Sequence, residues 1–168
     1  MSRSGYVDDM CDEWALIRYR GAVKSAIRGK RGQAFLREML AALDAMPEKR
    51  LISGALVFDG QPDIPWNVRP HEDVIIGGDQ LVTGYGETIR VGEVCAMGCL
   101  GRARGAKMEG VDAHDAPQVA GLFGIAEALA REIAHVNDED WWGENTPENR
   151  FKRVRKWVVD NLAETPDV

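Results

Sequence analysis

Two amphipathic segments joined by a very short break are the sequence feature that most constrains this fold. Residues 12–28 read DEWALIRYRGAVKSAIR, and their apolar residues recur at helical spacing. The members of this stripe are Leu16, Tyr19, Val23, Ala26 and Ile27. A second helix is predicted from 33 to 46, directly before Pro47. Because Gly29 and Gly32 bracket the short connection, the pattern predicts a helical hairpin.

The middle of the chain changes to β-favouring composition. Residues 50–60 (RLISGALVFDG) and 87–95 (ETIRVGEVC) are predicted as strands. Between them, the runs DVII and QLVTG are joined by Gly-Gly-Asp, which favours a hairpin. Helices then return, and the last begins with Thr146 as N-cap and Pro147 at its first position.

We therefore expect one α+β domain over residues 1–164, predominantly α-helical with a small antiparallel β-sheet or hairpin in the middle. It divides into a helical hairpin over 12–46, a β-rich segment with an extended arm over 50–95, and C-terminal helices over 95–163. Residues 165–168 are predicted to be a loose tail.

The stretch GEVCAMGCLGRARG, residues 92–105, is either a metal site, a phosphate loop or closely packed core. Cys95 and Cys99 would share one helix face, but zinc needs four ligands and no second ligand pair has suitable spacing. A phosphate loop would end in Gly-Lys-Ser/Thr, which is absent from the sequence. Its many small residues instead predict a helix that approaches its neighbour closely. We predict neither metal nor cofactor.

Hydrolytic motifs are also missing from the sequence, because none of the four serines lies in G-x-S-x-G. We predict that the chain is not an enzyme. A small enzyme that pairs Cys95 or Cys99 with a histidine is the least favoured alternative, since such partners meet in space rather than in sequence.

Local charge is the sharpest functional signal. The net charge of −6 disfavours a general nucleic-acid coat. However, residues 18–31 hold six basic residues and no acidic one, and RFKRVRK at 150–156 holds five more. The candidate binding residues are Arg20, Lys24, Arg28, Arg31, Lys152, Arg153, Arg155 and Lys156. Such clusters bind an acidic protein or a phosphate backbone. The alternative is an ordinary solvated face paired with Glu38, Glu144 and Glu148.

Aromatic residues in predicted loops supply candidate anchors at a binding surface: Trp66, Tyr85, Trp141 and Trp142. Alternatively, the tryptophan side chains fold back and cover the core as lids, which is an equally simple interpretation.

Several stretches together resemble a family of small uncharacterised proteins encoded by tailed bacteriophages and prophages. These are SRSGYVDD, RGAVKSAIRGKRGQAFLREMLAALDAMPEKRLI, GEVCAMGCLGRARG, FGIAEALAREIAHVND and RFKRVRKWV. The resemblance covers residues 2–57 and 92–162 and departs at about 58–90, where a much shorter link is expected. It implies no activity or cofactor, only a context in the cytoplasm of an infected or lysogenic bacterium.

These observations predict a non-enzymatic phage accessory protein that binds and modulates a host or bacterial-defence protein. Its contact surface would join the basic stripe to the arm around residues 65–85. A nucleic-acid-binding regulator that uses both basic clusters is the main alternative. No membrane partner is expected, because no apolar run approaches the ~20 residues that cross a bilayer.

Overall fold

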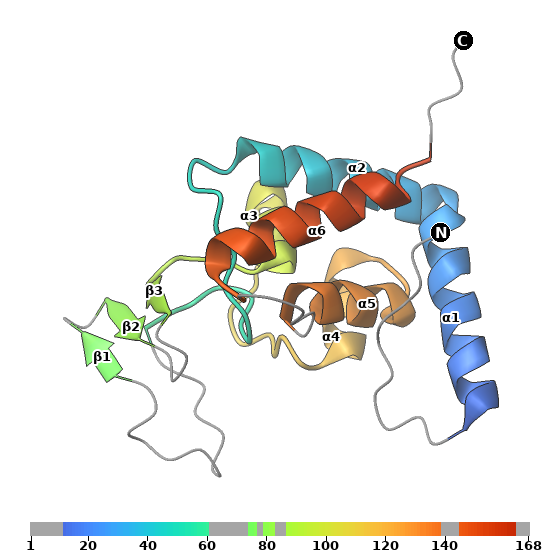
Figure 1. The fold of residues 1–168 in the computed structure, drawn as a ribbon, viewed down its shortest axis with the longest axis horizontal. Helices are drawn as coiled ribbons and strands as arrows, with labels where there is room; N and C mark the ends of the chain where they lie inside the picture. The colour runs from blue at the N-terminus through green and yellow to red at the C-terminus, as the bar shows by residue number, and fades with distance from the viewer. Residues whose placement is uncertain (1–11, 61–73, 77–78, 83–86, 139–144, 164–168) are drawn as a thin grey trace.

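A computed structural model describes residues 12–60, 74–76, 79–82, 87–138 and 145–163. This part of the chain holds six helices and one small antiparallel sheet (Figure 1). The predicted fold class, α+β with a predominance of helix, is confirmed. The helices are α1 (Glu13–Arg28), α2 (Lys30–Ala45), α3 (Ala96–Arg104), α4 (Ala116–Phe123), α5 (Glu127–Asp138) and α6 (Pro147–Asn161), and the strands are β1 (Val74–Ile76), β2 (Gln80–Val82) and β3 (Thr88–Arg90).

The connection between the first two helices is shorter than the sequence pattern predicted, and Figure 1 shows α2 leading away from the end of α1 rather than back along it, so the predicted antiparallel hairpin is wrong. Asp12 caps α1 by accepting a hydrogen bond from the Trp14 backbone N–H at 2.9 Å. Gly29 alone separates α1 from α2. Gly32 lies inside α2, and a Cβ added there would be 1.9 Å from the Ala26 carbonyl oxygen. Glycine at 32 therefore lets the second helix start directly against the end of the first.

The sheet is a three-stranded antiparallel meander in the order β1-β2-β3. Leu81 pairs with both Ile75 and Ile89, so it lies at the centre of the register. Leu81 and Ile89 are buried, while the sheet itself projects from one side of the helical body (Figure 1). The hairpin predicted from DVII and QLVTG corresponds to β1 and β2.

The prediction of a β-strand over residues 50–60 is wrong. Only one isolated bridge forms there, between Val57 and Val94. Backbone hydrogen bonds from Ile52 to Val94 and from Cys95 to Leu56 fix the segment beside the start of α3. Gly54, between these contacts, has a φ of +77°, a left-handed conformation that interrupts regular strand pairing.

The start of α3 is as closely packed as its small residues predicted. Cys95 is the N-cap and its Sγ accepts a hydrogen bond from the Gly98 N–H at 3.4 Å. A Cβ at Gly98 would lie 1.8 Å from the Leu56 carbonyl oxygen, and one at Gly101 would lie 2.2 Å from Met108 Sδ. The stretch at 92–105 is therefore a packing element of the core.

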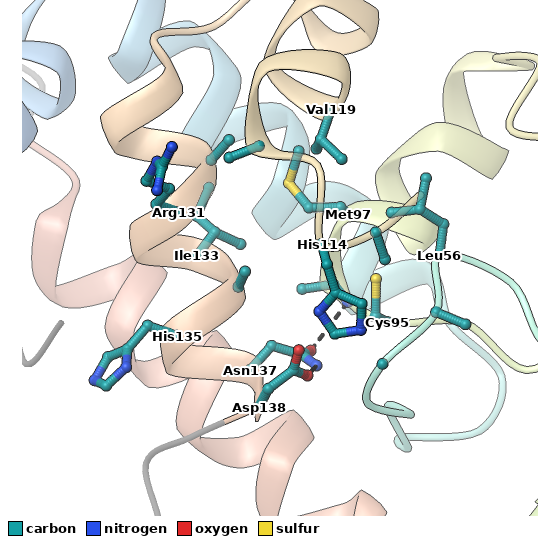
Figure 2. A pocket seen from close by; sticks show the side chains of 17 residues that line it. Leu56, Cys95, Met97, His114, Val119, Arg131, Ile133, His135, Asn137 and Asp138 are labelled. Carbon is teal, nitrogen blue, oxygen red and sulfur yellow. Dashed lines mark hydrogen bonds between the residues drawn. The ribbon is translucent and has the colours of Figure 1, made fainter. Parts of the chain in front are cut away.

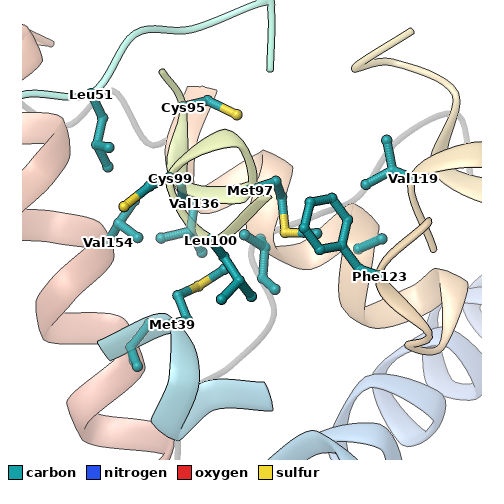
Figure 3. Packing of buried hydrophobic residues seen from close by; sticks show 14 of the residues in the cluster. Met39, Leu51, Cys95, Met97, Cys99, Leu100, Val119, Phe123, Val136 and Val154 are labelled. Atoms are coloured by element: carbon teal, nitrogen blue, oxygen red, sulfur yellow. The ribbon is translucent and has the colours of Figure 1, made fainter. Parts of the chain in front are cut away.

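A single cluster of buried apolar side chains includes members from every helix and from the sheet. In Figure 3, Met39, Leu100, Val136 and Val154 meet at its centre, and they come from four different helices. At the edge of the cluster, the rings of Phe35 and Phe123 pack edge to face with centroids 6.4 Å apart.

Candidate functional site

The outward side of α1 carries the first predicted basic cluster. Arg20, Lys24 and Arg28 are exposed on α1, and Arg31 is exposed in the first turn of α2. The opposite side of α1 buries Tyr19, Val23 and Ile27, which hold it against α5 and α2. The helix is thus anchored to the core by one side and presents its cations to solvent on the other.

None of these four cations has an ion pair or side-chain hydrogen bond within the described residues. Two of the acids proposed as their partners bind elsewhere. Glu38 pairs with Arg104 at 2.8 Å, and Glu148 pairs with Arg50 at 3.0 Å. The third, Glu144, lies outside the described residues. Pairing with Glu38 or Glu148 therefore does not account for the positive charge on α1.

Two large apolar side chains share this outward surface and were missed in the sequence analysis. Trp14 is 71% exposed and Ile17 is 57% exposed. Together with Gly21, Lys24 and Arg28 they recur at alternating steps of three and four residues. At 3.6 residues per turn this row lies about 140° around the helix from the buried stripe. We call these five residues the α1 outer row. The same spacing rule that found the buried stripe could have revealed them.

Gly21, in the middle of the row, is not required to be glycine by any contact with the described residues. A Cβ at this position would meet nothing within 4 Å, in contrast to the Cβ contacts at Gly32 and Gly98. Glycine in a helix interior costs about 0.5–1 kcal/mol relative to alanine.

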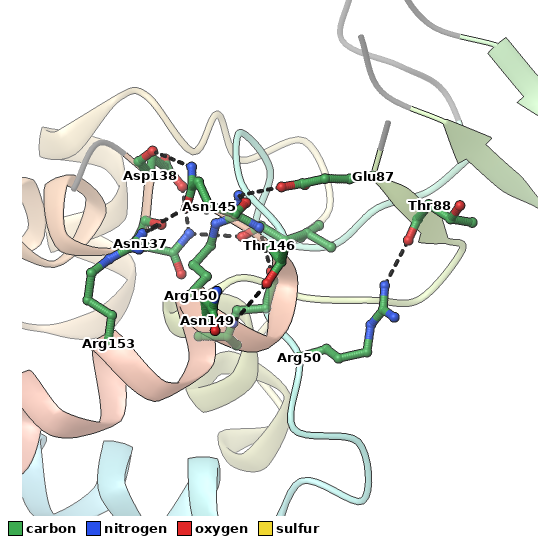
Figure 4. A network of polar contacts seen from close by, with 12 residues as sticks. Arg50, Glu87, Thr88, Asn137, Asp138, Asn145, Thr146, Asn149, Arg150 and Arg153 are labelled. Atoms are coloured by element: carbon green, nitrogen blue, oxygen red, sulfur yellow. Dashed lines mark hydrogen bonds and ion pairs between the residues drawn. The ribbon is translucent and has the colours of Figure 1, made fainter. Parts of the chain in front are cut away.

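The arginines of the second predicted cluster, on α6, make contacts within the molecule (Figure 4). Arg150 is 1% exposed, pairs with Glu87 at 3.2 Å and donates to the Leu51 carbonyl at 2.8 Å. Arg153 donates to the carbonyls of Val136 and Asn137, which lie at the end of α5. These arginines fasten α6 to its neighbours.

Further along α6, Arg155 binds Asp44 and Lys156 binds Asp160 at 2.5 Å. Lys152 is the only one of the four predicted α6 residues that makes no ion pair or side-chain hydrogen bond to any described residue. A role for these four in partner binding stays a prediction, but three of them already have internal contacts.

The two clusters do not form one surface. The α6 cluster occupies residues 150–156, whereas the last turn of α6 meets the start of α2, where Gln33 Nε2 donates to the Asn161 carbonyl at 3.0 Å. Figure 1 accordingly shows the start of α6 far from α1. The four predicted aromatic anchors, Trp66, Tyr85, Trp141 and Trp142, lie outside the described residues.

A separate pocket of about 250 Å³ lies between the start of α3, the 113–116 turn and α5 (Figure 2). Its polar end contains Cys95, His114, Asn137 and Asp138. In the view of Figure 2 the His114 imidazole points toward Asp138, whereas His135 points away from the pocket. Burial raises the pKa of Asp138, although a hydrogen bond from Asn137 Nδ2 at 2.5 Å partly offsets this effect.

This pocket does not supply an activated nucleophile. Burial raises the pKa of the Cys95 thiol to about 12 and that of Cys99 to about 11, so both thiols are protonated at neutral pH. Within the described part of the chain no hydrogen bond joins either sulfur to a histidine. A thiolate nucleophile would need such a partner or a lowered pKa.

No group of three or more His, Cys, Asp or Glu side chains among the described residues is arranged to hold a metal ion.

A second, more open hollow of about 530 Å³ lies between the end of α2, the turn at 90–94 and α3. Its three arginines are already bound. Arg50 pairs with Glu93 at 3.1 Å, Arg90 pairs with Glu48 at 3.8 Å, and Arg102 donates to a backbone carbonyl. Two of these three arginines therefore have carboxylate partners among the described residues.

Comparisons with protein-family models, with curated proteins and with solved structures find no significant match to this chain. No helix in the described ranges is long and apolar enough to cross a membrane.

Proposed function

We propose that this chain is a non-enzymatic interaction protein that binds an acidic protein partner through the outward side of α1 and thereby modulates that partner. The observation that carries the proposal is the contrast between two sets of cations. Those at the start of α6 are mostly bound within the molecule, whereas Arg20, Lys24, Arg28 and Arg31 make no ion pair with any described residue.

A protein fits this surface better than nucleic acid does. Trp14 and Ile17 are exposed beside the cations, and aromatic, apolar and arginine side chains together are typical of protein-binding hot spots. A phosphate backbone would gain little from these apolar groups, and the net charge of −6 would repel it elsewhere. The nucleic-acid regulator therefore remains the second candidate.

The resemblance to phage-encoded proteins supports a particular kind of partner. Within that context, the acidic partner would be a host protein or a component of a bacterial defence system, and binding would block or redirect it. This part of the proposal rests on analogy of context and not on the site.

The experiment is a tagged pull-down from bacterial lysate with nuclease present, read by mass spectrometry. The test variant reverses Lys24 and Arg28 to glutamate. The control variant reverses Arg37 and Lys107, which are exposed and make no ion pair or side-chain hydrogen bond with the described residues. Both variants have the same net charge, so they differ only in where the charge is lost.

We expect the wild type and the control to retain one acidic protein that the α1 variant loses. Equal capture by both variants would contradict the proposal. Recovery of nuclease-sensitive material alone would favour the nucleic-acid regulator.

A further inference from the structure

The α1 outer row has the spacing of a helix-packing seam. Trp14, Ile17, Gly21, Lys24 and Arg28 follow steps of three, four, three and four residues, which is the heptad pattern by which one helix packs along another. The buried stripe of the same helix is already occupied by α5 and α2. The outer row is therefore a second seam on α1, and it has no partner among the described residues.

We infer that the partner presents an acidic amphipathic helix that packs along the α1 outer row and crosses it at Gly21. This inference rests on the proposed function, because it names the partner segment that the α1 surface would bind.

Gly21 is the residue that points to a close crossing. Gly32 and Gly98 are glycines because a Cβ would strike backbone oxygen, whereas a Cβ at Gly21 meets nothing within 4 Å among the described residues. Packing against the described residues therefore does not compensate the destabilising effect of this glycine on α1. A residue without a side chain at the centre of a seam lets a second backbone approach closely.

The chemistry along the row specifies the occupant. One end presents Trp14 and Ile17, and the other presents Lys24 and Arg28. A matching helix has apolar side chains opposite the first pair and carboxylates opposite the second, with a small residue at the crossing. Carboxylates on the partner would neutralise cations that have no acidic partner among the described residues. A second copy of this chain packed in parallel through the same row would place cations near cations, and one packed antiparallel would place them opposite Trp14 and Ile17, so neither arrangement supplies carboxylates.

A synthetic helical peptide of this design provides the probe. It has leucines in one half of its seam, glutamates in the other half and alanine at the centre. A scrambled peptide of identical composition and a duplex DNA of similar length serve as comparisons. Binding is measured by anisotropy of the labelled peptide at two salt concentrations.

Gly121 supplies a matched control for Gly21. It lies in the helix α4, and a Cβ there also meets nothing within 4 Å. Gly21→Ala and Gly121→Ala should both keep or raise the melting temperature. Only Gly21→Ala should weaken peptide binding, by about tenfold, and Gly21→Leu should abolish it.

Equal binding by Gly21→Leu and the wild type would overturn the inference, as would equal binding of the scrambled peptide or the DNA, or no binding of the designed peptide. If any of these results appears while the α1 charge reversal still eliminates protein capture, the helix inference fails and the proposed function stands. If the charge reversal has no effect either, both fail.

Discussion

Arg155 donates two hydrogen bonds to Asp44, from Nε to Oδ1 at 2.6 Å and from Nη2 to Oδ2 at 3.2 Å. This contact ties α6 to α2, and the guanidinium holds the pKa of the Asp44 carboxyl below its usual value. Lys24 and Arg28, on α1, have no such carboxylate within the described residues. The difference between the two settings is the basis for assigning a structural role to one cluster and a binding role to the other.

Arg150 should be essential for stability. Arg150→Ala removes a cationic partner of Glu87, which is only 12% exposed, and removes the Arg150 donor of the Leu51 carbonyl. Breaking a buried ion pair from one side costs about 3–5 kcal/mol. Urea unfolding should show a loss of this size, whereas Lys152→Ala should stay within about 0.5 kcal/mol of the wild type. A nearly neutral Arg150→Ala would show that this pair does not hold α6.

Substitution by alanine should stabilise the protein at exposed helical glycines and destabilise it at a buried glycine. Gly21→Ala and Gly121→Ala should each stabilise the protein by about 0.5–1 kcal/mol, since both positions are open and helical. Gly98→Ala should destabilise it by about 1–3 kcal/mol, because the new methyl group collides with the Leu56 carbonyl. Thermal unfolding of the three variants checks this order, and a stabilised Gly98→Ala would refute the close packing of α3.

The thiols of Cys95 and Cys99 should react slowly until the solution is strongly alkaline. Their pKa values of about 12 for Cys95 and about 11 for Cys99 leave almost no thiolate at pH 7. Alkylation by iodoacetamide, mapped by peptide mass spectrometry, should rise with pH and reach Cys99 before Cys95. In urea both thiols should react with the ordinary pKa of about 9.

The same thiol shifts should make the fold alkali-sensitive. Because the folded pKa values lie above the unfolded ones, their contribution to stability is complete below about pH 9 and is lost as pH rises toward 11 and 12. In the alkylation experiment, rapid modification of Cys95 at pH 7 would contradict its raised pKa and would support the alternative of an enzyme that uses a cysteine thiolate.

Asp138 should make the protein less stable as pH rises. Burial raises the pKa of its carboxyl above the ordinary 3.8, so its neutral form is favoured in the folded state. Its contribution is therefore present at low pH and is lost as pH rises through the folded pKa. The unfolding free energy of Asp138→Asn, relative to that of the wild type, should increase as pH rises from 3 to 7. A difference that does not change with pH would contradict a raised pKa.

Local sequence signals predicted the helices well. Thr146 and Pro147 marked a helix start that the structure confirms, because capping depends on neighbouring residues alone. The extended segment at 50–60 was misread as a strand because its apolar residues are buried without regular pairing. Periodicity shows that a residue is buried but not which backbone it meets.

The binding partners of the charged side chains could not be predicted from the sequence. Asp44 lies 111 residues from Arg155, and Glu87 lies 63 residues from Arg150. Only the tertiary fold brings these pairs together, so two basic clusters that looked equivalent have different roles. Trp14 and Ile17, in contrast, could have been found by continuing the helical spacing around α1.

Site-specific photo-crosslinking tests the central claim most directly. A photoreactive phenylalanine analogue replaces Ile17 in the outer row of α1 or, as control, Val159, which is 43% exposed on α6. After irradiation in bacterial cells, the account predicts an adduct with one acidic protein from position 17, absent from position 159 and lost when Lys24 and Arg28 are reversed to glutamate. An adduct from position 159 with none from position 17, or one that survives the charge reversal, would contradict the assignment of α1 as the binding surface.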